Sequence, residues 1–398
     1  MKLKKVRPSS DVSTLLKDTS VIALSRFFVM FYNLTLIFFL SKEDYGQLAY
    51  YDYIAQFCLS ISSFGLTSVL IKDLHTKNNG EVLTNFLILK VFGILVINST
   101  WHLYLAWNNK AQFNFILMNY VYTFFLCLLW DWYFIGTNRT FLLVRYYIIN
   151  VLILIIGTIM LYFYTMLTAF SIRSLQLLSV IIALLAVCGP FVKEIKVSYF
   201  DLAYIKSVLR QGVFILGVQA MQSSVLTITT SVIKSNFGFA GLAPFSVALR
   251  LCQIVVSFRN MAIGPLTKFL MRKGPLYYSQ VINLHIRLVL MLFLILMVPF
   301  YLWGEGLIVF LWHDNRIWVV LLILSFIPLW NIMFIYDGVV ININKKQKMY
   351  FYSTSAAFLI FLTFIYYRSE SIYYYAFVYL LFESVYAFYN HFFIARKL

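Results

Sequence analysis

The chain has 398 residues, of which 62% are hydrophobic and 12% are charged, and its mean hydropathy is +0.83. A globular domain carries about a quarter charged residues, so this composition excludes a water-soluble fold. The net charge of +17 is distributed as single residues or small groups between hydrophobic stretches, which argues against a nucleic-acid-binding surface.

The hydrophobic stretches are long enough to cross a membrane. About 20 apolar residues in a helix cross about 30 Å of hydrocarbon, and lipid offers no partners to an unpaired backbone amide, so each stretch should be helical. We therefore predict an all-α polytopic membrane protein of about twelve transmembrane helices. The predicted spans are 19–40, 49–71, 82–106, 112–135, 141–163, 167–188, 212–233, 241–263, 284–303, 317–341, 350–366 and 371–394.

The basic residues predict the orientation of these helices. Alternate connections, beginning with residues 1–18 and 72–81, hold 21 lysines and arginines, whereas the connections on the other side hold 6. Cytoplasmic loops are enriched in basic residues, so both termini are predicted to lie in the cytoplasm. The expected location is the inner (cytoplasmic) membrane, with multiple passes.

The longest cytoplasmic connection lies at the midpoint of the chain. It divides residues 1–188, a six-helix half, from residues 212–398, a second six-helix half, and the linker 189–211 should contain an interfacial amphipathic helix. Each half has an even number of spans, so the halves should relate by an axis along the membrane normal. A weak repeat with a shift of 194 residues, in which Leu48-Ala49 and Cys58 recur as Leu242-Ala243 and Cys252, agrees with this division.

Sequence signatures of an enzyme are absent. The chain has no nucleotide-binding glycine loop and no zinc-protease or serine-hydrolase motif, and its histidines and cysteines lack ligand spacing. Glu43 and Asp44 could form the acidic pair of a membrane glycosyltransferase or polymerase. However, such enzymes usually hold their sugar substrate with a long external loop, and the external loops predicted here are short. We therefore expect no catalytic residues and no metal site.

Basic residues inside the spans are the first candidates for function. A charge at the bilayer centre costs at least about 2.5 kcal/mol, so it normally faces a partner or a watery cavity. Arg26, Lys90 and Arg250 are predicted to form a cationic, substrate-binding track in a central cleft. The alternative for each is a buried ion pair with a nearby carboxylate. Asp52 was expected to lie near the end of a span, where its carboxylate reaches water.

Three acidic residues form the second set of candidates. Asp131, Asp337 and Glu383 lie within predicted spans, and Glu383 matches Arg250 in depth. Carboxylates in a membrane cavity can take part in proton or sodium coupling, although charge pairing with the basic residues would explain them equally well. No other cofactor is expected. Pro328 should kink the tenth span.

Short motifs resemble one transporter family. They are Arg26 inside the first span, the turn Ser41-Lys42-Glu43-Asp44-Tyr45-Gly46, the end of the second span from Phe64-Gly65-Leu66 to Leu74, and the segment Asn236-Phe237-Gly238 to Arg250. Together with the topology, they resemble the polysaccharide-transporter branch of the multidrug/oligosaccharidyl-lipid/polysaccharide (MOP) exporter superfamily. The O-antigen repeat-unit flippases of Gram-negative bacteria are the most similar group.

The resemblance implies two six-helix halves around a central cleft, as in MOP and MATE transporters, working by alternating access. The implied substrate is an undecaprenyl-pyrophosphate-linked oligosaccharide that moves from the cytoplasmic to the periplasmic leaflet. Implied partners are membrane lipids, a polysaccharide polymerase and chain-length machinery, with no nucleic acid. A drug or small-molecule antiporter of the same superfamily is the alternative, and a membrane glycosyltransferase or polymerase is a more distant one.

Overall fold

The structure of the chain is a computed structural model. It describes residues 27–64, 66, 70, 73–74, 77–108, 112–129, 131–137, 139–273, 275–334, 337, 346–367 and 369–394. Within helices, nothing is described for the side chains of residues 257–282 and of a few others, including Asp131.

Every regular element in the described part is helical. A short apolar helix, Phe27–Phe38, ends in the 3₁₀ turn η1 (Leu36–Phe38). The helices that follow are α2 (Lys42–Ser62), α4 (Asn79–Asn108), α5 (Phe113–Cys127), α6 (Asp131–Gly136), α7 (Thr140–Phe163), α8 (Ala169–Cys188), the 3₁₀ turns η3 (Gly189–Glu194) and η4 (Val197–Tyr199), α9 (Leu202–Lys273), α10 (Pro275–Trp312), α11 (Asn315–Leu324), α12 (Phe326–Met333), α14 (Gln347–Ile365), α15 (Ile372–Tyr389) and the π-helical turn η5 (Asn390–Ile394).

Eight helices of the described part are long and apolar enough to cross a membrane. One of them is α9, which covers two of the predicted spans. These two spans are joined at a kink at Gly238, whose φ of 71° favours glycine. The predicted spans that remain correspond to the helix Phe27–Phe38, to α2 and to α15, which are shorter or carry more polar residues. The all-helical membrane fold is therefore confirmed.

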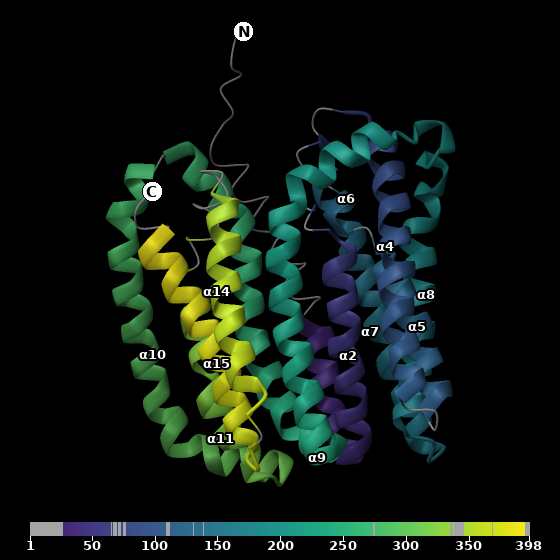
Figure 1. The fold of residues 1–398 in the computed structure, drawn as a ribbon. Helices are drawn as coiled ribbons and strands as arrows, with labels where there is room; N and C mark the ends of the chain where they lie inside the picture. Colours follow the sequence, from purple (N-terminus) through teal and green to yellow (C-terminus); the bar gives the residue numbers. More distant parts are fainter. Residues whose placement is uncertain are drawn as a thin grey trace.

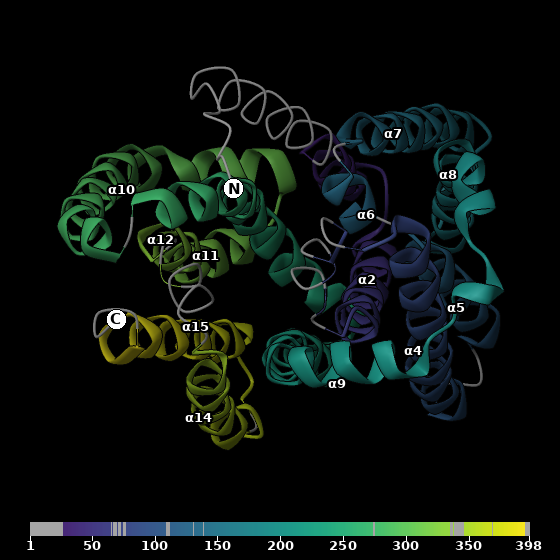
Figure 2. The same ribbon diagram turned by 90° about the horizontal axis from the view of Figure 1, so that it is seen from above.

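The helices run between two ends of one bundle. We call the end that holds η3 and η4 the linker end, and the opposite end, where α2, α8, α11 and α15 begin, the turn end. In Figures 1 and 2, α4 to α8 gather on one side of the bundle and α10 to α15 on the other. The long helix α9 packs against α2 and also against α11, α12, α14 and α15. We refer to α2 with α4 to α8 as the N-group and to α9 to α15 as the C-group. The predicted domain boundaries at residues 188 and 211 stay a prediction.

The start of α2 differs from the sequence prediction. The predicted second span began at residue 49, but α2 begins at Lys42, because the Ser41 side chain accepts a hydrogen bond from the Asp44 amide and acidic residues in the first turn suit the helix dipole. Asp52 consequently lies ten residues inside the helix, and its predicted position near a span end is wrong.

The first turn of α2 forms hydrogen bonds with two other helices, α9 and α8. Glu43 accepts a hydrogen bond from the Ala240 amide of α9 at 3.1 Å, and Asp44 accepts one from the Ala169 amide of α8 at 3.0 Å. The two carboxylates suggested in the sequence as an acidic pair thus bind different helix backbones. Gly46 lies so close to the Phe239 carbonyl that a Cβ atom would overlap it, so α2 and α9 approach closely at the turn end.

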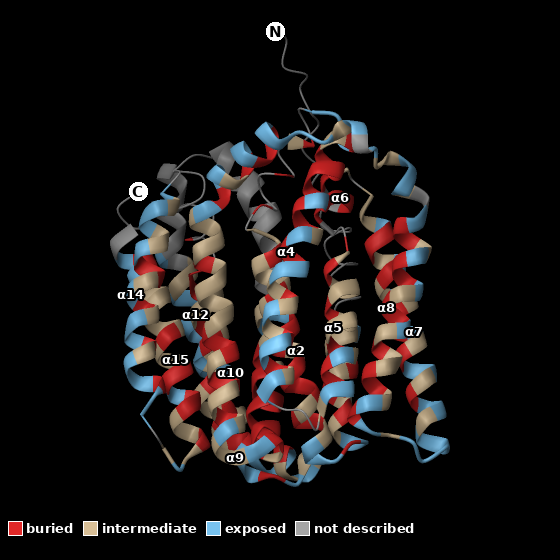
Figure 3. Cartoon of the chain, turned by 45° about the vertical axis from the view of Figure 1, so that its right-hand side comes forward, coloured by how far each residue is buried: buried red, intermediate tan, exposed pale blue. Residues whose placement is uncertain are grey.

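Burial follows the arrangement expected in a bilayer. The main apolar core is formed mostly by α2, α9, α11, α14 and α15, and a second core lies toward the linker end of the N-group. Large apolar side chains are exposed along the outer surface, for example Ile155 and Ile156 of α7 and Leu294 and Ile295 of α10. Figure 3 shows exposed residues along α14 at the edge of the bundle. Such apolar surface is suited to contact with lipid rather than water.

Two local predictions can be compared with the helices. The tenth predicted span is interrupted at Ser325, between α11 and α12, because Pro328 has no amide to bond the Leu324 carbonyl. In the linker, η3 and η4 are followed by the first turns of α9, and the interfacial amphipathic helix expected there stays a prediction. There Tyr204 is buried and donates a hydrogen bond to Asp73 at 2.7 Å, so this segment packs on the N-group.

Candidate functional site

One cavity of the bundle is lined mainly by helices of the N-group. It has a volume of about 490 Å³, and its lining includes Gln219 of α9. Its wall contains amide and hydroxyl side chains together with aromatic rings. The lining residues are Val29, Asn33, Gln56, Leu59, Ser60, Ser63, Phe86, Lys90, Tyr122, Leu126, Leu129, Trp132, Tyr146, Tyr147, Asn150, Leu154, Gln176, Ser179, Val180 and Gln219. We call this space the N-group cavity.

Lys90 contributes a positive charge to the described lining of the N-group cavity. It is the one charged side chain among the described residues that line it, and none of the others is acidic. The Lys90 side chain is 4% exposed and its ammonium group donates a hydrogen bond to the Leu129 carbonyl at 3.0 Å. It also lies 5.9 Å from the centre of the Phe86 ring. The sequence placed Lys90 in a cleft, and its substrate-binding role stays a prediction.

Arg250 of α9 lies in a different environment. Its guanidinium group donates to Asp52 of α2 at 2.7 Å, to the Asn33 carbonyl at 2.7 Å and to the Tyr45 hydroxyl at 3.2 Å. The alternative that the sequence leaves open for Arg250, an ion pair with a carboxylate, is what the structure shows, although the pair is only partly buried. Its partner is Asp52 rather than Glu383, which it matched in depth.

A second arginine shares the same carboxylate. Arg173 of α8 donates to Asp52 at 2.8 Å and to the Leu48 carbonyl at 3.1 Å, and its guanidinium lies 4.4 Å from the centre of the Tyr122 ring. The Arg173 side chain is fully buried, whereas those of Asp52 and Arg250 are 15% and 11% exposed. Asp52, Arg173 and Arg250 form what we call the gate cluster, which carries two positive charges and one negative charge.

The gate cluster adjoins the N-group cavity. Asn33, whose carbonyl oxygen accepts from Arg250, lines the cavity with Gln176, which lies one turn beyond Arg173 on α8 and donates to the Asn33 side chain at 3.3 Å. Tyr122, beneath the Arg173 guanidinium, lines it as well. The cluster therefore lies between this cavity and the close contact of α2 with α9.

Further polar contacts join the two groups near the turn end. Lys42 of α2 forms an ion pair with Asp314, which precedes α11, at 2.8 Å. The Tyr50 ring of α2 lies 4.7 Å from the Lys234 ammonium of α9. With the Glu43 and Arg250 contacts, these interactions hold the N-group and the C-group together at this end of the bundle.

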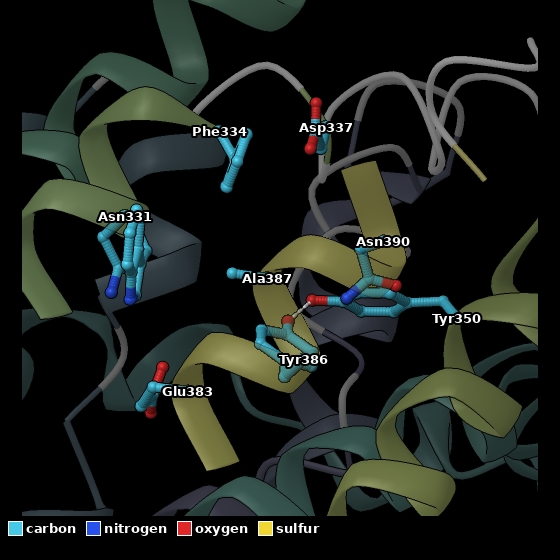
Figure 4. Close-up of a pocket in the computed structure, with 9 residues that line it drawn as sticks. Asn331, Phe334, Asp337, Tyr350, Glu383, Tyr386, Ala387 and Asn390 are labelled. Carbon is cyan, nitrogen blue, oxygen red and sulfur yellow. Dashed lines mark hydrogen bonds between the residues drawn. The ribbon is translucent and has the colours of Figure 1, made fainter. Parts of the chain in front are cut away.

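The C-group holds a much smaller cavity near the linker end, with a volume of about 30 Å³. Its lining residues, shown in Figure 4, are Trp330, Asn331, Phe334, Asp337, Tyr350, Glu383, Tyr386, Ala387 and Asn390. We call it the C-group pocket. Asp337 is buried and accepts a hydrogen bond from His391 at 3.1 Å, while Glu383 projects from α15 toward the same space. Two of the three acidic residues singled out in the sequence thus line the same pocket.

The remaining candidates cannot be placed. Arg26 lies outside the described residues. Asp131 begins α6, but its side chain is outside the described part as well. Of the three residues of the predicted cationic track, the structure therefore describes two. Lys90 lies at the cavity wall and Arg250 lies in the gate cluster.

The sequence reasoning missed three charged or titratable residues. Arg173 lies near the start of the predicted span 167–188 and counts there among the basic residues of the external side, but its long side chain reaches inward to Asp52. Asp52 was misjudged because its helix begins earlier than predicted. His391 was set aside for lack of ligand spacing, and its pairing with Asp337 across 54 residues could not be read from local sequence.

Comparison with known proteins identifies the fold. No family model and no curated protein sequence matches the chain. Among solved structures, the inward-facing conformation of a multidrug resistance MATE family transporter of the MOP superfamily matches with a TM-score of 0.70 at 12% identity, covering 94% of each chain. The MATE transporter VcmN of Vibrio cholerae, in its bent form, matches with a TM-score of 0.63 at 12% identity over 98% of this chain and 97% of that one.

An outward-facing MATE family transporter matches with a lower TM-score of 0.52, at 15% identity and over 98% and 96% of the two chains. At these identities the likeness concerns the fold. The chain therefore has the fold of the MATE transporters of the MOP superfamily, and its structural neighbours are transporters rather than enzymes.

Proposed function

We propose that the protein is a flippase that moves a lipid-linked oligosaccharide diphosphate, such as an O-antigen repeat unit on undecaprenyl pyrophosphate, across the inner membrane. The observation that carries this proposal is the lining of the N-group cavity, where amides, hydroxyls and aromatic rings surround a single cation and no carboxylate is described. Amide and hydroxyl groups can bond sugar hydroxyls, aromatic rings suit the apolar faces of sugar rings, and an ammonium group can bind phosphate.

The gate cluster and the predicted orientation together support an inward-facing conformation. If the linker end is cytoplasmic, as the basic residues predict, the polar contacts at the turn end close the periplasmic side. The higher TM-score with an inward-facing than with an outward-facing transporter supports the same conformation. In this proposal the oligosaccharide headgroup enters the N-group cavity from the cytoplasm and meets Lys90, and Arg250 contacts it after the gate cluster opens.

Exchange of Lys90 tests the proposal in cells. A charged hydrogen bond to phosphate contributes about 1.5–3 kcal/mol, so Lys90→Gln should weaken headgroup binding about 10- to 100-fold and strongly reduce surface polysaccharide. Lys90→Arg, which keeps the charge, should retain part of it. Lys206→Gln, an exposed lysine of α9, is the matched control. Normal surface polysaccharide with Lys90→Gln at wild-type protein levels would contradict the role of Lys90.

We further propose that the C-group pocket couples transport to a proton or sodium gradient. A carboxylate and an imidazole in contact, as in Asp337 and His391, can exchange a proton, and Glu383 adds a second carboxylate to the pocket lining. The prediction is that Asp337→Asn abolishes the acceleration of transport by an imposed gradient but keeps slow transport without one. Separate pH and sodium gradients across proteoliposomes identify the ion. A full response of Asp337→Asn to both gradients would refute the coupling role.

A cation–drug antiporter is the second candidate. It is favoured by the multidrug transporter among the structural neighbours and by the two carboxylates of the C-group pocket. A cationic drug would prefer an acidic site, and the described lining of the larger N-group cavity has the opposite charge. The volume of about 30 Å³ of the C-group pocket is also small for a drug, whereas the N-group cavity falls in the usual range of ligand sites.

A further inference from the structure

The gate cluster is asymmetric between the two groups of helices. Asp52 and Arg173 both belong to the N-group, whereas Arg250 belongs to α9. When α2 separates from α9, as alternating access requires, the ion pair between Arg250 and Asp52 breaks. The pair between Arg173 and Asp52 lies within one group and need not break.

Arg173 is anchored to the N-group independently of α9. Its guanidinium donates to the Leu48 carbonyl of α2 and lies over the Tyr122 ring of α5, and the side chain is fully buried. These contacts come from α2 and α5 and not from α9, so they can hold the Arg173 side chain in place when α9 moves away. Arg173 therefore keeps the Asp52 carboxylate in the orientation to which Arg250 binds.

A second arginine would be superfluous if the cluster only had to stay closed. One arginine and one aspartate already form a neutral pair, and a further buried cation adds a desolvation penalty. The second cation becomes useful when the first one leaves, because an unpaired carboxylate at this depth in the membrane is strongly unfavourable. The stoichiometry of two arginines to one aspartate thus suits a contact that opens and closes.

We propose that Arg173 is the permanent counter-ion of Asp52 and positions it as a reversible docking point for Arg250. In this role Arg173 lowers the free-energy cost of separating Arg250 from Asp52, and so of opening the turn end. The inference rests on the proposed transport function only in assuming that an open state at the turn end exists. It does not depend on which substrate is carried.

Three substitutions should have different effects on the gate. Arg250→Gln removes the contact between the groups and leaves the neutral pair of Arg173 and Asp52, so the turn end should open more often. Asp52→Asn leaves two facing arginines without a carboxylate and should open it further. Arg173→Gln leaves a neutral pair of Asp52 with Arg250, and opening would then expose an uncompensated carboxylate, so the gate should stay closed.

Labelling of a cysteine next to the gate cluster measures its opening. Ser246 is fully buried and lies one turn before Arg250 on the same face of α9. Ser246→Cys is made in a chain whose four native cysteines are alanine, and membrane vesicles of both orientations are treated with a maleimide that cannot cross the membrane. Labelling through the turn end should rise several-fold with Arg250→Gln and with Asp52→Asn, and should stay at or below the parent level with Arg173→Gln.

Controls separate this role from a purely structural one. Arg173→Lys keeps the charge and should restore the parent rate of labelling and of transport, while Arg287→Gln, an exposed arginine of α10, should change neither. If Arg173→Gln does not accumulate in the membrane, Asp52→Asn is compared with Asp52→Asn/Arg173→Gln. The double variant should be labelled less, because one of two repelling cations is gone.

Two results would overturn the inference. One is labelling of Arg173→Gln as strong as that of Arg250→Gln, and the other is equal labelling of Asp52→Asn with and without Arg173. Because the maleimide readout needs no substrate, either failure is distinguishable from a failure of the flippase proposal, which would appear as unchanged polysaccharide with Lys90→Gln.

Discussion

Asp314 shows how single charges hold the closed end of the bundle. Its side chain is 5% exposed and accepts hydrogen bonds from Lys42 of α2 and from Arg316 at the start of α11, each at 2.8 Å. Burial raises the pKa of the Asp314 carboxyl, but the hydrogen bonds from Arg316 and Lys42 outweigh it and hold the pKa at about 2, below the ordinary value of 3.8.

This shift predicts a pH dependence of stability. A carboxyl whose pKa is lowered by folding stabilises the folded state above its unfolded pKa, and this contribution is lost as the pH falls from about 4 toward 2. The partners of Asp314 are half exposed, so we expect about 1 kcal/mol after allowing for solvent screening. Asp314→Asn should therefore be less stable at pH 7 and lose less stability between pH 5 and pH 2, as measured by thermal unfolding in detergent. An identical acid dependence of both proteins would contradict this account.

Lys90 and Arg250 were both singled out from the sequence, because a cation within an apolar stretch is unexpected. Their environments could not be separated in this way. Lys90 lines the cavity, whereas Arg250 contacts a carboxylate that lies 198 residues away in the chain. The sequence predicts how deep a residue lies along its helix. Contacts between residues of different helices depend on tertiary packing.

Hydrophobicity and capping set the limits of prediction for the helices. The long apolar stretches corresponding to α4, α7 and α8 were predicted within a few residues, because hydropathy alone identifies a helix in a membrane. Hydropathy places the polar first turn of α2 in a loop, because its charged residues lower the mean hydropathy and the helix start depends on capping by Ser41. Because the predicted span starts too late, Asp52 is predicted near its end, and the gate cluster cannot be inferred from the sequence.

The break between α11 and α12 was partly predictable. Pro328 indicated an interruption of the tenth span, and the structure has it three residues earlier, at Ser325. The C-group pocket was less accessible to prediction, because its residues come from α12, α14 and α15 and from the segment after α12. Asp337 and Glu383 were named from their charge alone, and their common location is a result of the fold.

The whole molecule combines a cationic cavity in one group of helices, an acidic pocket in the other, and a charged contact where the groups meet. This distribution fits a transporter in which the anionic substrate and the coupling cation occupy different groups of helices. Release of Arg250 from Asp52 would connect the cavity with the turn end. We propose that the transported molecule is an anionic lipid-linked sugar.

Reconstitution of the purified protein into vesicles tests that claim most directly. A radiolabelled undecaprenyl-diphosphate oligosaccharide is added to the vesicles, and its exposure on the outer leaflet is followed with a glycosidase that cannot cross the membrane. The account predicts that the wild-type protein moves the lipid between leaflets much faster than protein-free vesicles do, and that Lys90→Gln approaches the protein-free rate. Retention of the lipid in its original leaflet, with exchange of an organic cation for protons by the same vesicles, would contradict the account and favour a drug antiporter.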